Sequence, residues 1–242
     1  MSVPRQYGVS RFLALGALFI LPVTSGAQER APIAEQIGKA YGVDSFGKVE
    51  AIRYTFSIPQ LKLSRSWVWE PATDTVSYDG KDKEGNPVKV TYKRSEVDSQ
   101  SDAVKKNIDP AFVNDNYVLL FPWHVAWDTW ATVTDEGMQE MPISKKSARR
   151  VIVKYPGEGG YSPGDTWELY VGNDHRIEEF VYHRNGPGFP QVYTATWAVD
   201  RKAGPLLFST ERHGTGDGKA VDIVVSDVAV KLTGSDNWIE AK

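Results

Sequence analysis

The stretch PAFVNDNYVLLFPWHVAWDTW, residues 110–130, decides the fold because the strand-like segments on both sides have to enclose it. Asp109 and Pro110 are typical of a helix start, where Asp accepts from free N–H groups and Pro loses no hydrogen bond. Apolar residues then recur at helical spacing, and Pro122 disfavours helical geometry at the residue before it. We therefore predict an apolar helix that ends at Phe121 and is buried against a sheet.

The segments around this helix alternate between apolar and polar residues, as half-buried β-strands do. The clearest case is residues 50–58 (EAIRYTFSI). Short turn sequences rich in Gly, Asn and Asp separate the segments, and such connections join neighbouring antiparallel strands. Further strands are predicted at residues 61–69, 73–78, 87–94, 130–134, 148–155, 166–171, 176–183, 192–199, 205–212 and 220–230.

A second helix is expected within residues 28–46, where Ile33, Ile37 and Tyr41 share one face and Gly42 suits the C-terminal stop. A flat meander of this width would expose one apolar face, whereas a twisted and curled sheet can cover helices. The predicted fold class is mainly β (α+β). We predict that a single curved antiparallel sheet, a half-barrel, wraps the N-terminal helix and the inserted apolar helix, and that residues 28–242 form one domain.

Residues 1–27 have the order of a secretory signal peptide. Arg5 and Arg11 make a positive start, an apolar run follows at 12–23, and small residues stand at 25–27. The apolar run is shorter than the ~20 residues that span a bilayer. We predict cleavage after Ala27, a periplasmic or secreted location, and no transmembrane segment in the mature chain. The absence of cysteine excludes disulfides and a lipid-anchored N-terminal Cys, and fits a Gram-negative periplasm.

The charge balance argues against a nucleic-acid partner, because the formal net charge is −3 and phosphate binding requires clustered Lys and Arg. The one basic run, residues 145–150, is interpreted as a solvated strand edge. The GYSPG sequence at 160–164 matches the serine-hydrolase pattern G-x-S-x-G. However, Pro163 lacks the N–H that would serve an oxyanion hole, so we predict a plain hairpin there. The four histidines lie in separate segments, and we predict no metal and no cofactor.

His124 and Asp128 are four residues apart and can form a base with its orienting carboxylate. No nucleophile or metal partner accompanies them in the sequence. A structural role is therefore the first interpretation of this pair, and an enzymatic role is the alternative.

The unusual feature of the composition is its aromatic content, with 8 Trp, 11 Tyr and 9 Phe. An aromatic core explains most of these rings, but rings around an apolar helix also suit the lining of a hydrophobic cavity. If a cavity exists, we expect its ligand to make apolar contacts with two residues of an early strand and with residues around the central helix. The predicted ligand-binding residues are Trp67, Trp69, Tyr117, Leu120, Phe121, Trp123 and Trp127.

Two groups of motifs carry a resemblance to a known superfamily. FVND at 112–115 with LLFP at 119–122, and KYP at 154–156 with GGYSPGD at 159–165, are similar to an uncharacterised secreted bacterial family of the LolA/LolB-like lipoprotein-sorting type. The resemblance covers roughly residues 52–230. It implies an incomplete barrel whose concave apolar face receives acyl chains and is closed by an inserted helix. Arg53 and Arg65 are the candidates here for the carrier's key arginine.

Three functional hypotheses follow from these observations. The first is a soluble periplasmic protein that binds or carries a lipid or another hydrophobic small molecule, with no covalent step. The second is an enzyme that acts on a hydrophobic molecule in the same cavity, with His124 and Asp128 as its polar pair. The third is a cell-envelope interaction module with a filled aromatic core and no ligand.

Overall fold

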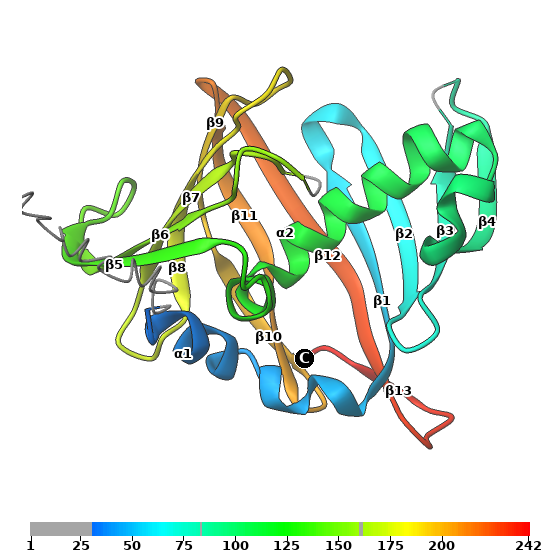
Figure 1. Ribbon diagram of the computed structural model, residues 1–242, viewed down its shortest axis with the longest axis horizontal. Helices are drawn as coiled ribbons and strands as arrows, with labels where there is room; N and C mark the ends of the chain where they lie inside the picture. The colour runs from blue at the N-terminus through cyan, green and yellow to red at the C-terminus, as the bar shows by residue number, and fades with distance from the viewer. Residues whose placement is uncertain (1–30, 83, 160–161) are drawn as a thin grey trace, which may run out of the picture.

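The computed structural model describes residues 31–82, 84–159 and 162–242, so the predicted signal peptide lies outside the described residues. The described chain forms one 13-stranded antiparallel sheet that curves around a long helix (Figure 1). This sheet does not close into a barrel, because β4 and β5 stand at opposite ends of the strand order. The predicted fold class is confirmed.

The helices are α1 (Ile33–Ala40) and α2 (Asp109–Trp127), with short 3₁₀ segments at Val43–Lys48, Pro59–Leu61 and Arg94–Ser99 and a π-helical turn at Val104–Ile108. The strands are β1 Val49–Ile58, β2 Leu63–Glu70, β3 Thr75–Lys81, β4 Pro87–Lys93, β5 Thr132–Glu140, β6 Ser147–Lys154, β7 Thr166–Val171, β8 Ile177–His183, β9 Val192–Thr196, β10 Ala198–Ala203, β11 Leu206–Gly216, β12 Lys219–Leu232 and β13 Trp238–Glu240.

The strand order shows how the chain is threaded. Along the sheet it runs β4-β3-β2-β1-β12-β11-β9-β8-β7-β6-β5, with β10 beside β11 and β13 beside β12. The predicted meander is therefore correct in most of its hairpins, but its first strand pairs with its last long strand. The predicted strand at 192–199 is divided into β9 and β10, and β10 makes the hairpin with β11. The step from β4 to β5 joins the two edges of the sheet, and α2 makes this step across the concave side (Figure 1).

Strict alternation along the early strands fills the concave face. Tyr54 of β1 lies opposite Trp67 of β2, which in turn lies opposite Tyr78 of β3, and all three side chains are buried. A register slip of one residue would turn these rings outward, so their burial fixes the pairing.

Helix α1 packs against α2 at one end of the concavity, on the face that its apolar spacing predicts. Gly42 follows this helix with a φ of 93°, as the predicted stop requires. A Cβ at this position would lie 2.4 Å from the carbonyl oxygen of Pro205, so the close approach of the two segments also demands glycine.

Helix α2 differs from its prediction at both ends. Asp109 is its first residue and makes no cap; its carboxylate instead accepts from the Tyr92 hydroxyl at 3.0 Å and from Arg94 Nε at 2.9 Å. The predicted end at Phe121 is wrong, because the helix continues through Pro122 to Trp127. The backbone departs from helical angles at the residue before Phe121, so the proline bends the helix without ending it.

The continuation past Pro122 depends on a buried arginine of β11. Pro122 has no N–H for the carbonyl of Val118, four residues earlier, and that oxygen loses its helical partner. Arg212 Nη2 donates to this oxygen at 3.1 Å, and its guanidinium lies 3.4 Å from the ring centroid of Trp197. Complete burial lowers the pKa of Arg212 to about 9. Thus one side chain joins the sheet to the bend of α2.

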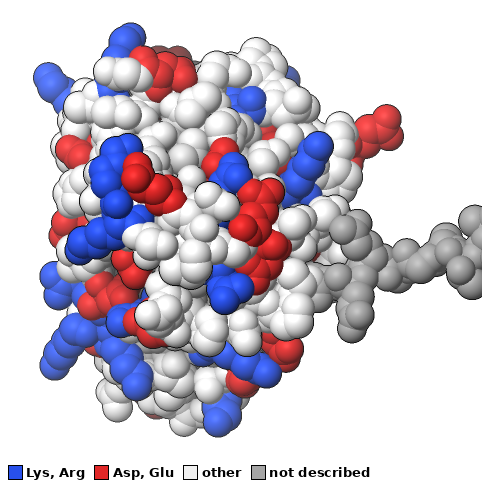
Figure 2. All heavy atoms as spheres, turned by 90° about the vertical axis from the view of Figure 1, so that its left-hand side faces the viewer, with Lys and Arg blue, Asp and Glu red and all other residues white. Residues whose placement is uncertain are grey.

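Charged side chains of both signs are interleaved on the face that Figure 2 shows. In the predicted basic run, Arg149 pairs with Asp135 at 2.6 Å, and Arg150 pairs with Glu168 at 2.6 Å. The predicted strand edge is therefore wrong, because the two arginines lie on β6, which pairs with β5 on one side and β7 on the other, and carboxylates of these neighbours balance their charge. Among the residues whose structure is described, no helix has the length and apolar character needed to cross a membrane.

We predict that Pro122 and Arg212 are energetically coupled through the Val118 carbonyl. Pro122→Ala restores a helical N–H for this oxygen, so Arg212→Met should cost about 1 kcal/mol less in that background than in the wild type. The measurement is a double-mutant cycle of urea unfolding free energies.

The control is the same cycle with Pro110→Ala. Pro110 stands at the start of α2, eight residues before Val118, so its replacement leaves the hydrogen bonding of the Val118 carbonyl unchanged and this pair should be additive. Additivity of the Pro122 and Arg212 pair would contradict the proposed contact.

Candidate functional site

Two cavities flank the N-terminal half of α2 on the concave side of the sheet. We call the first the apolar cavity, of about 360 Å³, after the aliphatic and aromatic strand residues of its wall, and the second the polar cavity, of about 390 Å³, after the hydrogen bonds of Asp128 at its side. Val113, Tyr117 and Ser162 line both, so the two cavities are neighbours at one turn of the helix. Each volume lies within the ~300–1,000 Å³ range of small-molecule pockets.

The apolar cavity lies between α2 and a wall built from several strands. β1 contributes Phe56 and Ile58, and β12 contributes Val221 and Ile223. Apolar residues at alternate positions of a strand share one face, which is why both pairs point inward. The remaining lining residues are Pro110, Val113, Asn114, Tyr117, Val118, Ser162, Asp165, Trp167, Phe180, Tyr182, Arg184, Phe189, Pro190 and Tyr193.

Polar groups gather where the β7 and β8 connections border this cavity. The Tyr182 hydroxyl donates to Asp165 Oδ2 at 2.5 Å, and Arg184 Nε donates to the carbonyl oxygen of Pro190 at 3.2 Å. The guanidinium of Arg184 also lies 5.6 Å from the Tyr182 ring centroid. The cavity therefore has an apolar body with a few polar groups on one side, the usual composition of a hydrophobic binding site.

The polar cavity is organised around Asp128, the residue that follows α2. Its Oδ2 accepts from the hydroxyls of Tyr117 and Tyr155, each at 2.8 Å, and its Oδ1 lies 3.3 Å from His124 Nδ1. Burial raises the pKa of Asp128, but these hydrogen bonds and His124 outweigh it, and the net shift is downward. Burial and the Asp128 charge raise the pKa of Tyr155. Both tyrosines therefore stay protonated donors around an ionised carboxylate.

The structure brings His124 and Asp128 together, as the enzyme hypothesis requires. The ring of Tyr117 stacks on the His124 imidazole with centroids 3.7 Å apart, which fixes the ring plane. In the described part of the chain, His124 Nε2 is buried and has no hydrogen-bond partner. Ser162 also lines this cavity, but no hydrogen bond joins it to the imidazole, so an assembled nucleophile–base pair is absent among the described residues.

The predicted ligand-binding residues fall into two groups. Trp69, Tyr117 and Trp127 line the polar cavity, and Tyr117 lines the apolar cavity as well. The other four predicted residues are buried at positions outside both cavities. These are Trp67, Leu120, Phe121 and Trp123.

The buried group supports the walls around the cavities. Phe121 stacks on Trp167 with ring centroids 4.0 Å apart, and Trp167 lines the apolar cavity. Trp123 packs on Tyr41 and on Phe208 in the core.

Trp67 connects the sheet to α2. Its Nε1 donates to Asp115 Oδ2 at 2.9 Å, and Arg65 Nη2 donates to Asp115 Oδ1 at 2.7 Å. Arg65 therefore contacts the inserted helix. Arg53 is the other arginine considered. It lies on the face of the sheet opposite to Arg65, where it pairs with Glu240.

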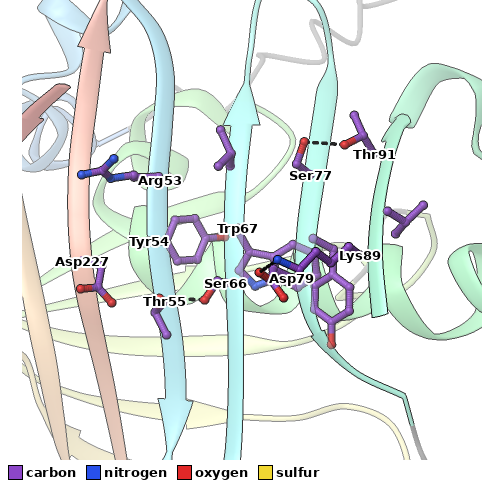
Figure 3. A pocket seen from close by; sticks show the side chains of 13 residues that line it. Arg53, Tyr54, Thr55, Ser66, Trp67, Ser77, Asp79, Lys89, Thr91 and Asp227 are labelled. Atoms are coloured by element: carbon purple, nitrogen blue, oxygen red, sulfur yellow. Dashed lines mark hydrogen bonds and ion pairs between the residues drawn. The ribbon is translucent and has the colours of Figure 1, made fainter. Parts of the chain in front are cut away.

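A third hollow, of about 450 Å³, lies over β1 to β4 around the residues of Figure 3. It presents paired hydroxyls, with Thr55 and Ser66 2.9 Å apart and Ser77 and Thr91 2.8 Å apart. An Asp79–Lys89 ion pair of 2.8 Å stands beside them. This hollow is open to solvent, so it encloses a ligand less than the two cavities beside α2 do.

The strand residues of the apolar cavity were missed from the sequence. Val221 and Ile223 belong to β12, more than 160 positions from Phe56, and only the β1–β12 pairing brings them together. The alternation of apolar residues in the sequence does place Val221 and Ile223 on one face of a strand. Which helix or cavity that face meets depends on the topology.

Comparisons with known proteins give likenesses to solved structures only. No protein-family model matches this chain, and no curated protein matches it.

Three solved structures illustrate the likeness. A DUF1329 family protein from Desulfovibrio piger has 12% identity and a TM-score of 0.44, covering 85% of this chain and 95% of its own. A putative outer membrane lipoprotein-sorting protein domain from Vibrio parahaemolyticus has 8% identity and a TM-score of 0.47, with 87% and 95% covered. A LolA superfamily protein from Nitrosomonas europaea has 8% identity and a TM-score of 0.44, with 84% and 93% covered.

We predict a specific pH dependence of stability from Asp115. Burial raises the pKa of its carboxyl from 3.8 to about 6, against the opposing effects of Arg65 and Trp67. The folded state therefore holds this proton more tightly than the unfolded state. Its contribution to stability is complete below pH ~4 and is lost as the pH rises through about 6, by an amount on the order of 3 kcal/mol.

The measurement is the urea unfolding free energy of the wild type and Asp115→Asn from pH 4 to pH 7. The variant should lack this fall, whatever its absolute stability. Asp236→Asn, at an exposed aspartate, should follow the wild-type profile. Parallel curves for the wild type and Asp115→Asn would show that Asp115 does not titrate in this window.

Proposed function

We propose that this protein binds and carries a lipid or another hydrophobic molecule in the apolar cavity beside α2. One observation carries the proposal: a space of about 360 Å³ remains on the concave face, and aromatic and aliphatic side chains of five strands and the helix line most of it. A packed core leaves few voids larger than a water molecule, so an apolar space of this size is suited to a ligand.

The position of α2 supports the same proposal. The helix crosses the concavity and is fastened at its start by Asp109 and at its bend by Arg212. Between these two fastened points, Val113, Tyr117 and Val118 face the cavity. A ligand would therefore be held between a fixed helix and a fixed sheet, which limits the ordering cost of binding.

An enzyme acting in the polar cavity is the second candidate. It is favoured by the His124–Asp128 pair, whose orientation leaves Nε2 directed away from the carboxylate. If this pair acts as a base, His124→Ala should reduce any turnover of a hydrophobic ester or alcohol by ~10²-fold or more. Unchanged turnover in this variant would eliminate this candidate.

Filling the apolar cavity should abolish ligand uptake without unfolding the protein. Ile58 is half-buried at the end of β1, and Ile58→Trp places an indole in the empty space. We expect binding of N-phenyl-1-naphthylamine, an uncharged apolar dye, to weaken by about tenfold or more, the equivalent of ~1.4 kcal/mol. The measurement is a fluorescence titration, with Tm recorded for each variant.

The matched control is Ser57→Trp, which adds the same ring one residue earlier on the opposite face of β1. It should bind the dye as the wild type does. Equal binding by Ile58→Trp and Ser57→Trp, or no dye binding by the wild type, would contradict the proposed site.

A further inference from the structure

Three hairpin connections lie together at one end of the sheet. They join β1 to β2 at residues 59–62, β8 to β9 at residues 184–191 and β11 to β12 at residues 217–218. All three stand at the top of Figure 1. We call these connections, together with Val192 and Lys219 directly after two of them, the rim.

Hydrogen bonds link the three connections of the rim. Asp217 Oδ2 accepts from the Gln191 N–H, and its Oδ1 accepts from the Val192 N–H, each at 2.9 Å. Gln60 Nε2 donates to Asp222 Oδ2 at 2.6 Å, and the Asp222 N–H donates back to Gln60 Oε1 at 3.1 Å. The rim therefore presents its side chains from one connected support.

Three large apolar side chains of the rim are exposed to solvent. The exposed fractions are 59% for Leu61, 47% for Phe189 and 40% for Val192. Phe189 also lines the apolar cavity, as does Ile58 directly before the β1–β2 connection. The cavity therefore reaches the surface at the rim, and its apolar lining continues onto the outside of the protein.

The charged side chains of the rim are mostly basic. Lys62, Arg184 and Lys219 stand against one carboxylate, Asp217, although the whole chain has a formal net charge of −3. Among the described residues, none of these three basic side chains takes part in an ion pair, whereas Asp217 accepts from two backbone N–H groups.

Two further carboxylates lie next to the rim. Asp165 is buried and accepts from the Tyr182 hydroxyl and from the Asn185 N–H. Asp222 accepts from Gln60 and lies 3.1 Å from His213 Nδ1. Both carboxylates have partners within the protein, so the unpaired charges at this end of the sheet are positive.

This combination of side chains suits a membrane surface. Exposed apolar residues gathered at one place mark an interaction site. Lys62 directly follows Leu61, and Lys219 Nζ lies 5.6 Å from the ring centroid of Phe189. In each pair the apolar group can enter the acyl region of a bilayer while the ammonium group stays at the lipid phosphates. Unpaired basic side chains are attracted to anionic lipids.

We propose that the rim docks on a membrane surface that contains anionic lipid. Its apolar side chains insert among the acyl chains, and its three basic side chains contact the phosphates. The mouth of the apolar cavity then faces the bilayer, and a hydrophobic molecule can pass between the two without exposing its surface to water. Docking goes beyond the proposed function, and only this passage rests on it.

The test is co-flotation of the purified protein with large unilamellar vesicles. One set consists of phosphatidylcholine alone, and the other contains about 30% phosphatidylglycerol, which supplies negative surface charge. The wild type should bind the anionic vesicles about tenfold more tightly or more, because three unpaired basic side chains each favour an anionic surface. Raising the salt concentration to about 0.5 M should remove most of this difference, since salt screens exposed charges.

Leu61→Ser and Lys219→Gln separate the apolar contribution from the charged one. Both side chains are exposed and neither lines the apolar cavity, so Tm and binding of N-phenyl-1-naphthylamine should stay as in the wild type. Leu61→Ser should weaken binding to both kinds of vesicle by about three- to tenfold. Lys219→Gln should weaken binding to the anionic vesicles by about fivefold and leave binding to phosphatidylcholine unchanged.

Ile143→Ser and Lys146→Gln are the matched controls. Both residues are exposed and belong to the β5–β6 connection, which the strand pairing places at the opposite end of the strands from the rim. These variants should bind both kinds of vesicle as the wild type does.

Failure of the wild type to float with the anionic vesicles would overturn the proposal. So would vesicle binding that the two rim variants leave unchanged, or that the controls weaken equally. Vesicle binding requires no ligand, whereas failure of the proposed function would appear as absence of dye binding in the wild type. The two failures are therefore distinguishable.

Discussion

The contact between Arg212 and the Val118 carbonyl is the interaction on which the rest of the structure depends. Pro122 removes one helical hydrogen bond from α2, and a buried arginine from β11 supplies the missing donor. This exchange lets a single helix bend and still reach from β4 to β5, the two edges of the sheet. If the helix stopped at the proline, its aromatic tail would not cover the interior of the sheet.

The first half of α2 is fastened by carboxylates. Asp109 accepts from Tyr92 and Arg94, and Asp115 accepts from Arg65 and Trp67. Each buried carboxylate has donors from the sheet, which offsets its loss of water. These polar contacts add to the packing of the buried apolar side chains of the helix, such as Phe112 and Leu119. The two cavities lie beside the turns between these points, so the same contacts that hold the helix also leave room beside it.

The sequence predicts the local structure of this protein well because local rules control it. Alternation in β1 and the glycine after α1 depend on nearby residues alone, and both are as expected. The length of α2 is different, since the donor that satisfies Val118 comes from Arg212, 94 residues further along. The walls of the apolar cavity depend likewise on the pairing of β1 with β12.

The aromatic residues show the same limit. Trp69 and Trp123 have the same local signature, an indole in an apolar segment, but the first lines a cavity and the second lies in the core. Strand register and the rotation of the helix decide whether an indole lines a cavity or lies in the core, and both are set by tertiary contacts. His124 and Asp128 form the pair that the sequence suggested because helical spacing brings residues four apart together.

Photo-crosslinking is the most direct test of a ligand in the apolar cavity. A lauric acid with a diazirine at the end of its acyl chain would be bound to the protein and irradiated, and the labelled residues would be identified by peptide mass spectrometry. The account predicts saturable labelling of β1 and β12 residues that line the apolar cavity, such as Ile58 and Ile223. Labelling confined to the hollow over β1 to β4, or labelling that unmodified laurate does not suppress, would contradict it.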